Sequence, residues 1–442
     1  MNNGLSPKGD RGGWPRAASG LQTFQALRDY NYRLLWLGSL GHSIGMWMDQ
    51  IARNWLIWEL TGSPVLLGLV NAAGGLPMLF FGIWGGVAAD RFDRRKILLI
   101  CQAVTWLVYL SLAILISSRQ IQVWHIFANS ILMGTAMAFN MPTRQSMIPG
   151  LVPPAMLGNA IGLNVLAMNI TRVLGPTIAG VLIPILGTGG VYWLSTVIYT
   201  GVVVSTIMMR LPAFLPSLLR GTPWGDLVGG FRYIWQTRLI VTILVIGLVP
   251  ILLGMPYMTL LPAFADQILG VGATGFGLLT SVAGVGGLAG ALVVASVNFR
   301  REGMAMLIAA FFFGAFLVVL GAAPILVVTV PALFLIGITN SLFQAMTQTV
   351  LMRITSEEMR GRVMGIRMLD FGLSPLGSSF AGFLAELTSL PLTIMVMGSS
   401  CALLAVGAAV VAPSLRNLGR EAASVEPEVV QGERLAPLVV RR

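Results

Sequence analysis

Long apolar runs separated by short charged segments constrain this chain more than any other feature. Between residues 65 and 117, two such runs flank a charged cluster that extends from Asp90 to Lys96. Asp90 is followed by five more charges within six positions, and the chain then becomes apolar again. This pattern is typical of two closely packed membrane helices joined by a cytoplasmic loop. It predicts an integral membrane protein.

The composition extends this prediction to the whole chain. Hydrophobic residues make up 56% of the 442 positions and charged residues 10%, whereas soluble proteins carry about 25% charged residues. Lipid must therefore be the main solvent. A membrane helix needs about 20 apolar residues, which leaves room for about twelve spans. We expect an all-α fold with spans at 34–59, 65–89, 97–117, 123–143, 157–186, 190–210, 239–263, 274–297, 304–322, 327–350, 362–386 and 392–412.

The longest interior connection, residues 211–238, divides these spans six and six. It mixes arginines with aromatic side chains, which favours a helix at the membrane surface. Residues 151–160 resemble residues 354–363, and this weak repeat indicates two pseudo-symmetric six-helix halves around a central cavity. Chance similarity of apolar helices is the alternative. We expect a cytoplasmic segment at 1–33, halves at 34–210 and 239–412, and a disordered tail at 413–442.

The net charge of +11 is explained by orientation in the membrane. If the N-terminus is cytoplasmic, 25 of the 28 Lys and Arg residues lie on cytoplasmic segments. This asymmetry follows the positive-inside rule and predicts a plasma (inner) membrane protein with both termini in the cytoplasm. The positive segments also attract anionic lipid. Orientation and lipid attraction together explain the basic charge, so no nucleic-acid partner is expected.

The sequence indicates neither metal nor cofactor chemistry. Cys101 and Cys401 both fall in apolar spans, where we expect packing roles. His42 and His125 are the only histidines, and no Gly-x-x-x-x-Gly-Lys-Ser/Thr loop for a nucleotide phosphate is present. We therefore expect no metal, no cofactor and no enzymatic activity.

The charged loop resembles the signature loop between helices 2 and 3 of the major facilitator superfamily. The consensus of that loop is Gly-x-x-x-Asp-Arg-x-Gly-Arg-Arg. It is matched here by Gly86, Asp90, Arg91, Arg94 and Arg95, and Asp93 replaces its second glycine. Residues 31–36, 60–64, 141–145 with 158–160, and 360–363 are similar to the bacterial branch that includes the enterobactin exporter. The resemblance covers residues 24–412 and implies alternating access, with proton-coupled export of a small organic molecule such as a drug or siderophore. We expect a monomer.

The resemblance also implies a gate. In an outward-open state, Asp90 would interact with the positive N-terminal end of the helix near Gly361. Arg94 would pair with Asp90, and Gly86 would allow two helices to approach closely. The segment Arg360, Gly361 and Arg362 resembles the partner element in the second half. The alternative is that these charges only set topology.

Asp49 and Arg53 are charges near the middle of the first span. Their spacing of four residues places them on one helix face. A charge at this depth costs about 2.5–3.5 kcal/mol on insertion scales, so both should face a cavity or each other. We expect Asp49 to bind and release the coupling proton beside Arg53. A static ion pair is the alternative.

Arg172 is the other cation within a span, with Asn164 and Asn169 upstream. It is a candidate to bind an anionic cargo group, and structural pairing with an acid is the alternative. The following residues partly match the antiporter motif of helix 5, which favours antiport; the matching positions are Gly175, Pro176 and Gly180.

The second half carries further polar candidates. Asp370 is a possible second titrating group, or pairs with Arg367. Asn340 and Gln344 lie four residues apart and are expected to line the cavity, with hydrogen bonding between helices as the alternative. Two other functions stay open at this stage. One is import or facilitated diffusion of a nutrient or lipid, and the other is a non-transporting receptor or scaffold.

Overall fold

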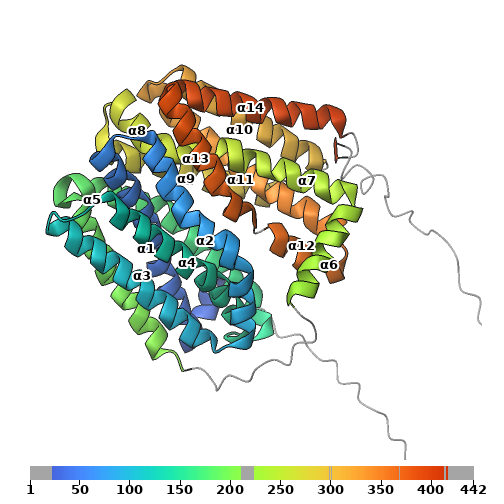
Figure 1. Cartoon of the computed structure of the whole chain (residues 1–442). Coiled ribbons are helices and arrows are strands. Elements are labelled where there is room, and N and C mark those ends of the chain that lie inside the picture. Colours follow the sequence, from blue (N-terminus) through green and yellow to red (C-terminus); the bar gives the residue numbers. More distant parts are fainter. Residues whose placement is uncertain are drawn as a thin grey trace, which may run out of the picture.

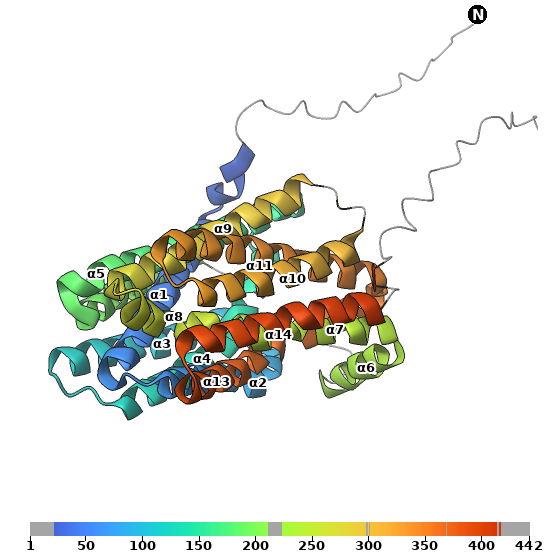
Figure 2. The ribbon, with the colours of Figure 1, turned by 90° about the horizontal axis from the view of Figure 1, so that it is seen from above.

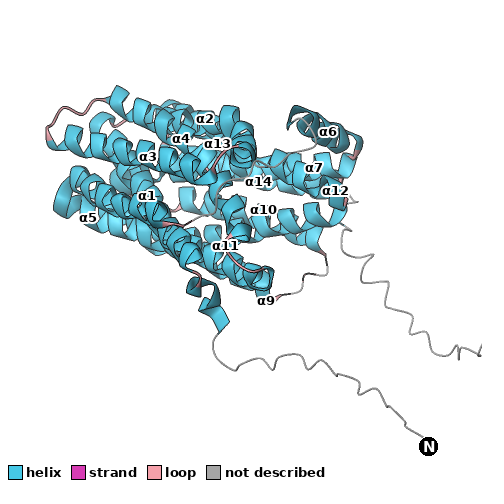
Figure 3. Cartoon of the chain, turned by 90° about the horizontal axis from the view of Figure 1, so that it is seen from below, coloured by secondary structure: helices cyan, strands magenta, loops and turns pink. Residues whose placement is uncertain are grey.

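The computed structural model describes residues 22–210, 223–297, 299, 301–367, 369–412 and 415–416. These residues form helices and short connections, without a β-strand among them (Figure 3). The elements up to residue 208 are η1 (Gln22–Arg28), α1 (Tyr30–Thr61), α2 (Pro64–Arg91), α3 (Arg94–Ser117), α4 (Val123–Met147), η2 (Ile148–Gly150), η3 (Pro154–Met156) and α5 (Leu157–Met208). The all-α prediction is confirmed.

The rest of the described chain is equally helical (Figure 1). Its elements are α6 (Pro223–Gln236), α7 (Arg238–Val249), η4 (Pro250–Gly254), α8 (Tyr257–Ala263), η5 (Phe264–Ile268), α9 (Gly272–Ser296), α10 (Glu302–Ala322), α11 (Leu326–Ile354), α12 (Glu357–Arg367), α13 (Leu369–Leu387) and α14 (Leu390–Val411). Both η4 and η5 are single π-helical turns.

Short polar residues set the helix ends. Asp29 and Ser63 accept hydrogen bonds from the first turns of α1 and α2, as N-cap residues do. Gly62 ends α1 with φ 59°, a left-handed conformation that suits glycine. Asp93, the departure from the signature consensus, caps α3 by accepting a hydrogen bond from the Arg95 backbone at 2.9 Å. This capping gives a physical reason for an acid at that position.

Eight helices or runs of consecutive helices within the described residues are long and apolar enough to cross a membrane. They lie at Pro64–Gly82, Arg94–Ser117, Pro154–Met208, Arg238–Ile268, Gly272–Ser296, Glu302–Ala322, Leu326–Ile354 and Leu390–Val411. The charged helix α1 is not among them. The run to Met208 covers two predicted spans, and Gly187 within it has the non-helical φ/ψ values of 69° and 170°.

The long helices pack in neighbouring pairs. Helix α1 packs on α5 and α2 on α4, while α9 packs on α11 and α10 on α14. Two further pairs join early and late parts of the chain, namely α2 with α13 and α5 with α9. Figures 1 and 2 show these helices running roughly lengthwise through one body.

Glycines permit the contacts between the early and late parts. A Cβ atom at Gly277 of α9 would lie 2.5 Å from the Cα of Gly180 in α5 and 2.6 Å from the carbonyl oxygen of Pro176. A Cβ atom at Gly382 of α13 would lie 2.5 Å from the carbonyl oxygen of Pro64. Only residues without side chains fit at such distances, as in other closely packed membrane helices.

The predicted linker contains the helix α6, which packs against α12 and α7. Its Trp235 is 83% exposed, which fits contact with a membrane surface. The predicted segments 1–33 and 413–442 lie largely outside the described residues, as does the start of the linker at 211–222.

Candidate functional site

A buried acid in the middle of α1 forms the centre of the candidate site. The side chain of Arg53 lies one turn away, with Nη2 3.6 Å from Oδ2 of Asp49. The hydroxyl of Tyr192 in α5 donates to Oδ1 of Asp49 at 3.1 Å. Arg53 also donates to the Ser130 hydroxyl in α4 at 3.3 Å. Asp49 is only 4% exposed, so these partners replace the water that would otherwise solvate it.

Three tyrosine rings extend this site toward α3. Tyr109 packs edge-on against Tyr199 at 5.4 Å and also contacts Tyr192, with ring centroids 6.2 Å apart. The Tyr199 hydroxyl lies 2.7 Å from Nδ1 of His42. Sequence reasoning missed the three tyrosines, because each comes from an apolar span far from Asp49 along the chain.

Arg144 in α4 is a buried cation that the sequence assigned to a cytoplasmic segment. It donates to the Ser39 hydroxyl at 3.0 Å and to Asn140 at 3.4 Å. Its Nη2 has no hydrogen-bond partner within the described residues. The surrounding run Met-Pro-Thr-Arg-Gln was the only signal for this site, through its family resemblance.

Arg172 of α5 lies against α1 and α9. Its guanidinium carbon is 5.9 Å from the centre of the Trp47 ring. Among the described residues, the side-chain amides of Asn169 and Asn164 form hydrogen bonds only within their own helix, to the Val165 carbonyl and the Met168 sulfur. These asparagines are partly exposed.

The helix-5 motif residues make close contacts between helices. A side chain at Gly175 would overlap Trp47 of α1, and one at Gly180 would come 2.7 Å from Gly277. Pro176 is buried between these contacts, and the helix continues through it. The motif thus holds α5 against α1 on one side and α9 on the other.

The candidates of the second half form a separate group. Arg367 donates to the side chain of Gln344 at 3.0 Å. Asp370 is 9% exposed. The Oδ1 atom of Asn340 is buried without a hydrogen-bond partner in the described part of the chain. The charges of Asp370 and Arg367 are near enough to interact, so their pairing stays an alternative to a titrating role for Asp370.

The signature loop binds to the ends of neighbouring helices. Arg94 donates to the carbonyl of Ala89 at 2.9 Å and to that of Ser146 at 3.0 Å. Arg95 donates to the Thr206 and Ile207 carbonyls at the end of α5. Both arginines complete helix C-termini, where cations are favourable. Arg91 is exposed.

Two predictions on this loop stay predictions. Asp90 belongs to α2, and its side chain lies outside the described part of the structure, so its pairing with Arg94 is untested. A Cβ atom at Gly86 would meet no atom within 4 Å. In this conformation α2 approaches α13 elsewhere, for example at Gly68 and Gly75.

The partner element at the start of α12 faces the linker helix. Arg360 donates to the Met352 carbonyl at 3.0 Å and lies 3.6 Å from Glu357. The Arg362 side chain lies beside Gly229 of α6, and Gly361 is exposed. The gating role predicted for this element is not tested by these contacts.

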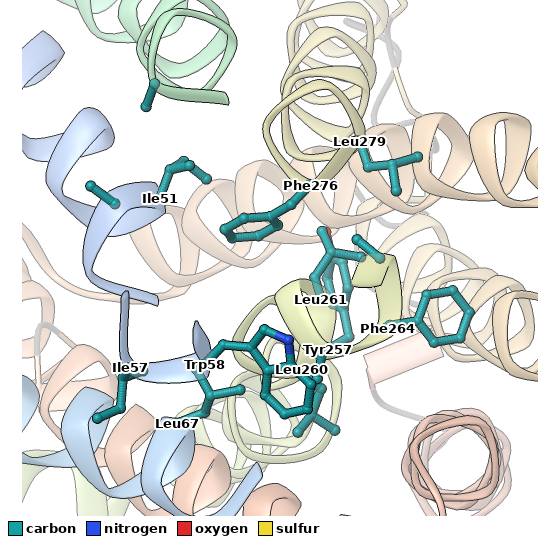
Figure 4. Close-up of a cluster of buried hydrophobic side chains, with 14 of the residues drawn as sticks. Ile51, Ile57, Trp58, Leu67, Tyr257, Leu260, Leu261, Phe264, Phe276 and Leu279 are labelled. Carbon is teal, nitrogen blue, oxygen red and sulfur yellow. The ribbon is translucent and has the colours of Figure 1, made fainter. Parts of the chain in front are cut away.

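At the opposite end of the bundle, α1 is joined to the second half of the chain. The indole Nε1 of Trp58 donates to Oδ2 of Asp266 in η5 at 2.9 Å. Figure 4 shows Trp58 beside Tyr257, Leu260 and Leu67 in a buried apolar cluster. The charge asymmetry of the sequence assigns this end to the outside.

Comparison with solved structures defines the class of the fold. A nucleoside transporter superposes with a TM-score of 0.71 at 14% identity, over 86% of this chain and 99% of that one. A bacterial homologue of the lysosomal transporter Spinster, in an inward-facing conformation, has a TM-score of 0.65 at 15% identity, over 91% of this chain and 98% of that one. The chain thus shares the helical fold of these two proteins.

Sequence comparison gives the family. Residues 21–439 match the family described as transmembrane secretion effector, and the chain belongs to this family of major facilitator transporters. It is 25% identical to a staphyloferrin A transporter of Staphylococcus aureus, over 81% of this chain and 90% of the relative. It is 26% identical to the multidrug efflux pump Tap of Mycolicibacterium fortuitum (87% and 96% covered) and 26% identical to the enterobactin exporter EntS of Shigella boydii (76% and 80% covered). The predicted family branch is confirmed, and the family consists of transporters rather than enzymes.

Proposed function

We propose that this protein exports a small organic molecule across the inner membrane by alternating access, driven by inward movement of protons. The observation that carries the proposal is the buried Asp49, with Arg53 and Tyr192 as its partners. An acid in the middle of a membrane helix is energetically costly. Such residues are therefore typically paired or functional. The efflux pump and the exporter among the relatives favour export.

The proposed architecture has twelve spans in two six-helix halves, with both termini in the cytoplasm. Leaving out the linker helix α6, counting α5 as two spans at Gly187, and joining α7 to η5 and α12 to α13 brings the helices to this number. The contacts α2–α13 and α5–α9 then pair span 2 with span 11 and span 5 with span 8. A two-fold relation between halves exchanges these two pairs, which supports the arrangement.

In this mechanism Asp49 takes up a proton from one side and releases it to the other. The guanidinium group of Arg53 and the hydroxyl of Tyr192 both contact the carboxyl group of Asp49. A change in either contact during the transport cycle would alter the proton affinity of Asp49. The contacts of Asp49 with Arg53 and Tyr192 therefore support a role for this acid in coupling protons to conformation.

The decisive experiment measures efflux from proteoliposomes with and without an imposed pH gradient. The panel contains a fluorescent dye, several antibiotics and a catecholate siderophore. We expect at least one compound to move in a gradient-dependent manner, and Asp49→Asn to abolish that dependence. Glu59→Gln is the matched control, because Glu59 lies on the same helix but is exposed.

Each remaining outcome points to a different function. Full gradient-driven transport by Asp49→Asn would remove Asp49 as the proton site. Transport down a cargo gradient without proton dependence would indicate facilitated diffusion. Absence of transport for every compound, in protein shown to be folded, would favour a receptor or scaffold over the proposed exporter.

A further inference from the structure

Arg172 has an unusual position among the arginines within the helices of the first half. Its side chain comes from α5, and its guanidinium group lies against the ring of Trp47 in α1. A Cβ atom at Gly287 of α9 would lie 3.3 Å from Nη1 of Arg172. Tyr257 of α8 lies within electrostatic range of the same cation. Arg172 is therefore at a meeting point of four helices from both ends of the chain.

The other two internal arginines have polar side-chain partners, whereas Arg172 does not. Arg53 contacts Asp49 and Ser130, and Arg144 contacts Ser39 and Asn140. Within the described residues, Arg172 makes neither a hydrogen bond nor an ion pair, and its side chain stays partly exposed. A guanidinium group carries five N–H donors and stays charged. The Trp47 ring offsets part of the cost of this charge, but it leaves the N–H donors of Arg172 to water or a ligand.

The groups around Arg172 are also donors without partners. Neither the indole N–H of Trp47 nor the hydroxyl of Tyr257 has a hydrogen-bond partner in the described part of the chain. No Asp or Glu side chain of the described residues forms an ion pair there. On the α9 side, the guanidinium group lies so close to the backbone of Gly287 that a Cβ atom there would be 3.3 Å from Nη1. A site with this set of donors matches the oxygen atoms of an anion.

We infer that Arg172 and Trp47 bind the carboxylate end of an organic cargo that also carries a flat apolar part. The planar guanidinium group pairs with a carboxylate through two parallel hydrogen bonds. The ring of Trp47 offers an apolar face for the rest of the molecule. This inference rests on the proposed function in that the bound molecule is the cargo, and it assigns that cargo to the class of amphipathic carboxylates.

Binding without flux tests this inference separately from transport. The full chain is placed in nanodiscs, and equilibrium dialysis measures its affinity for 2-naphthoate and for the uncharged 2-naphthamide. We expect wild-type protein to prefer 2-naphthoate by about tenfold, as a charge-assisted pair would provide. Arg172→Gln should remove the preference, while Arg172→Lys should retain part of it. Arg238→Gln, at an exposed position at the start of α7, should bind like wild type.

A second variant keeps the test valid if Arg172→Gln does not fold. Gly287→Ala retains the charge but adds a methyl group beside Nη1, so it should weaken binding of 2-naphthoate more than binding of 2-naphthamide. Equal affinity of wild type for the two compounds, or an unchanged preference in Arg172→Gln, would overturn the inference. If wild-type protein bound the two compounds equally but still carried out proton-driven efflux, this inference would fail and the proposed function would stand. Selective binding without any transport would instead contradict the proposed function alone.

Discussion

At the residue scale, the central feature is an acid that the protein solvates with its own groups. Asp49 receives one hydrogen bond from Tyr192 and the charge of Arg53, and both contacts come from side chains packed by long helices. A hydrogen bond to a charged group contributes about 1.5–3 kcal/mol. The stability of the first half should therefore depend on single polar atoms near Asp49.

We predict that Tyr192→Phe lowers the free energy of unfolding by about 1.5–3 kcal/mol, because it removes the donor to a buried carboxylate without changing the ring. Thermal unfolding in detergent, followed by tryptophan fluorescence, measures the shift. Tyr30→Phe is the matched control, since the Tyr30 hydroxyl makes only an exposed hydrogen bond of 3.5 Å. Equal shifts for the two variants would show that the Tyr192 contact has no special role.

At the scale of the elements, pairs of glycines decide how closely the helices approach. Helix α5 carries Gly175 against α1 and Gly180 against α9, so one helix joins both parts of the chain. Close approach in a membrane depends on packing and short polar contacts, because lipid offers no hydrophobic drive between helices. A single methyl group at such a contact should therefore have a measurable cost.

We predict that Gly277→Ala destabilises the protein by about 1–3 kcal/mol, the usual cost of an overpacked contact. Its Cβ atom would lie 2.5 Å from Gly180, so α5 and α9 must move apart. Gly201→Ala is the control, because a Cβ atom at Gly201 would meet no atom within 4 Å. Unfolding midpoints of the two variants should differ clearly. A midpoint for Gly277→Ala as high as that for Gly201→Ala would contradict the packing argument.

At the scale of the whole molecule, the end containing Trp58 is closed by contacts between the two parts of the chain. The Trp58–Asp266 hydrogen bond joins α1 to η5, and nearby Gly382 of α13 lies closely against Pro64 at the start of α2. In alternating access, these contacts must break when this end opens. Each one therefore biases the balance between the two states.

We predict that Trp58→Phe shifts this balance toward opening of that end by about tenfold, because it removes a hydrogen bond to a carboxylate. Ala273→Cys, at a buried position of α9, reports the opening through its rate of labelling by a membrane-impermeant maleimide. The background carries Cys101→Ala and Cys401→Ala. Trp124→Phe is the control, because its indole donates only to nearby Gln122. Labelling no faster in Trp58→Phe than in Trp124→Phe would rule out a closing role for the Trp58–Asp266 contact.

Several features follow from sequence alone because they are local or depend on composition. Apolar runs of sufficient length predict membrane helices whatever surrounds them. The four-residue spacing of Asp49 and Arg53 predicts their contact, since a helix places such residues on one face. The branch of the family is likewise carried by short stretches that can be recognised without a structure.

The tertiary structure decided which distant residues meet. Tyr192 lies 143 residues from Asp49, and Asp266 lies 208 residues from Trp58. Arg144 sits in a segment that the sequence placed at the cytoplasmic surface, yet packing against α1 buries it. Such contacts depend on how each helix is rotated and on how closely glycines allow two helices to approach. The average hydropathy of a span indicates neither. Sequence by itself therefore determined the solvent, the helices and the family, whereas packing between helices determined the environment of each charge.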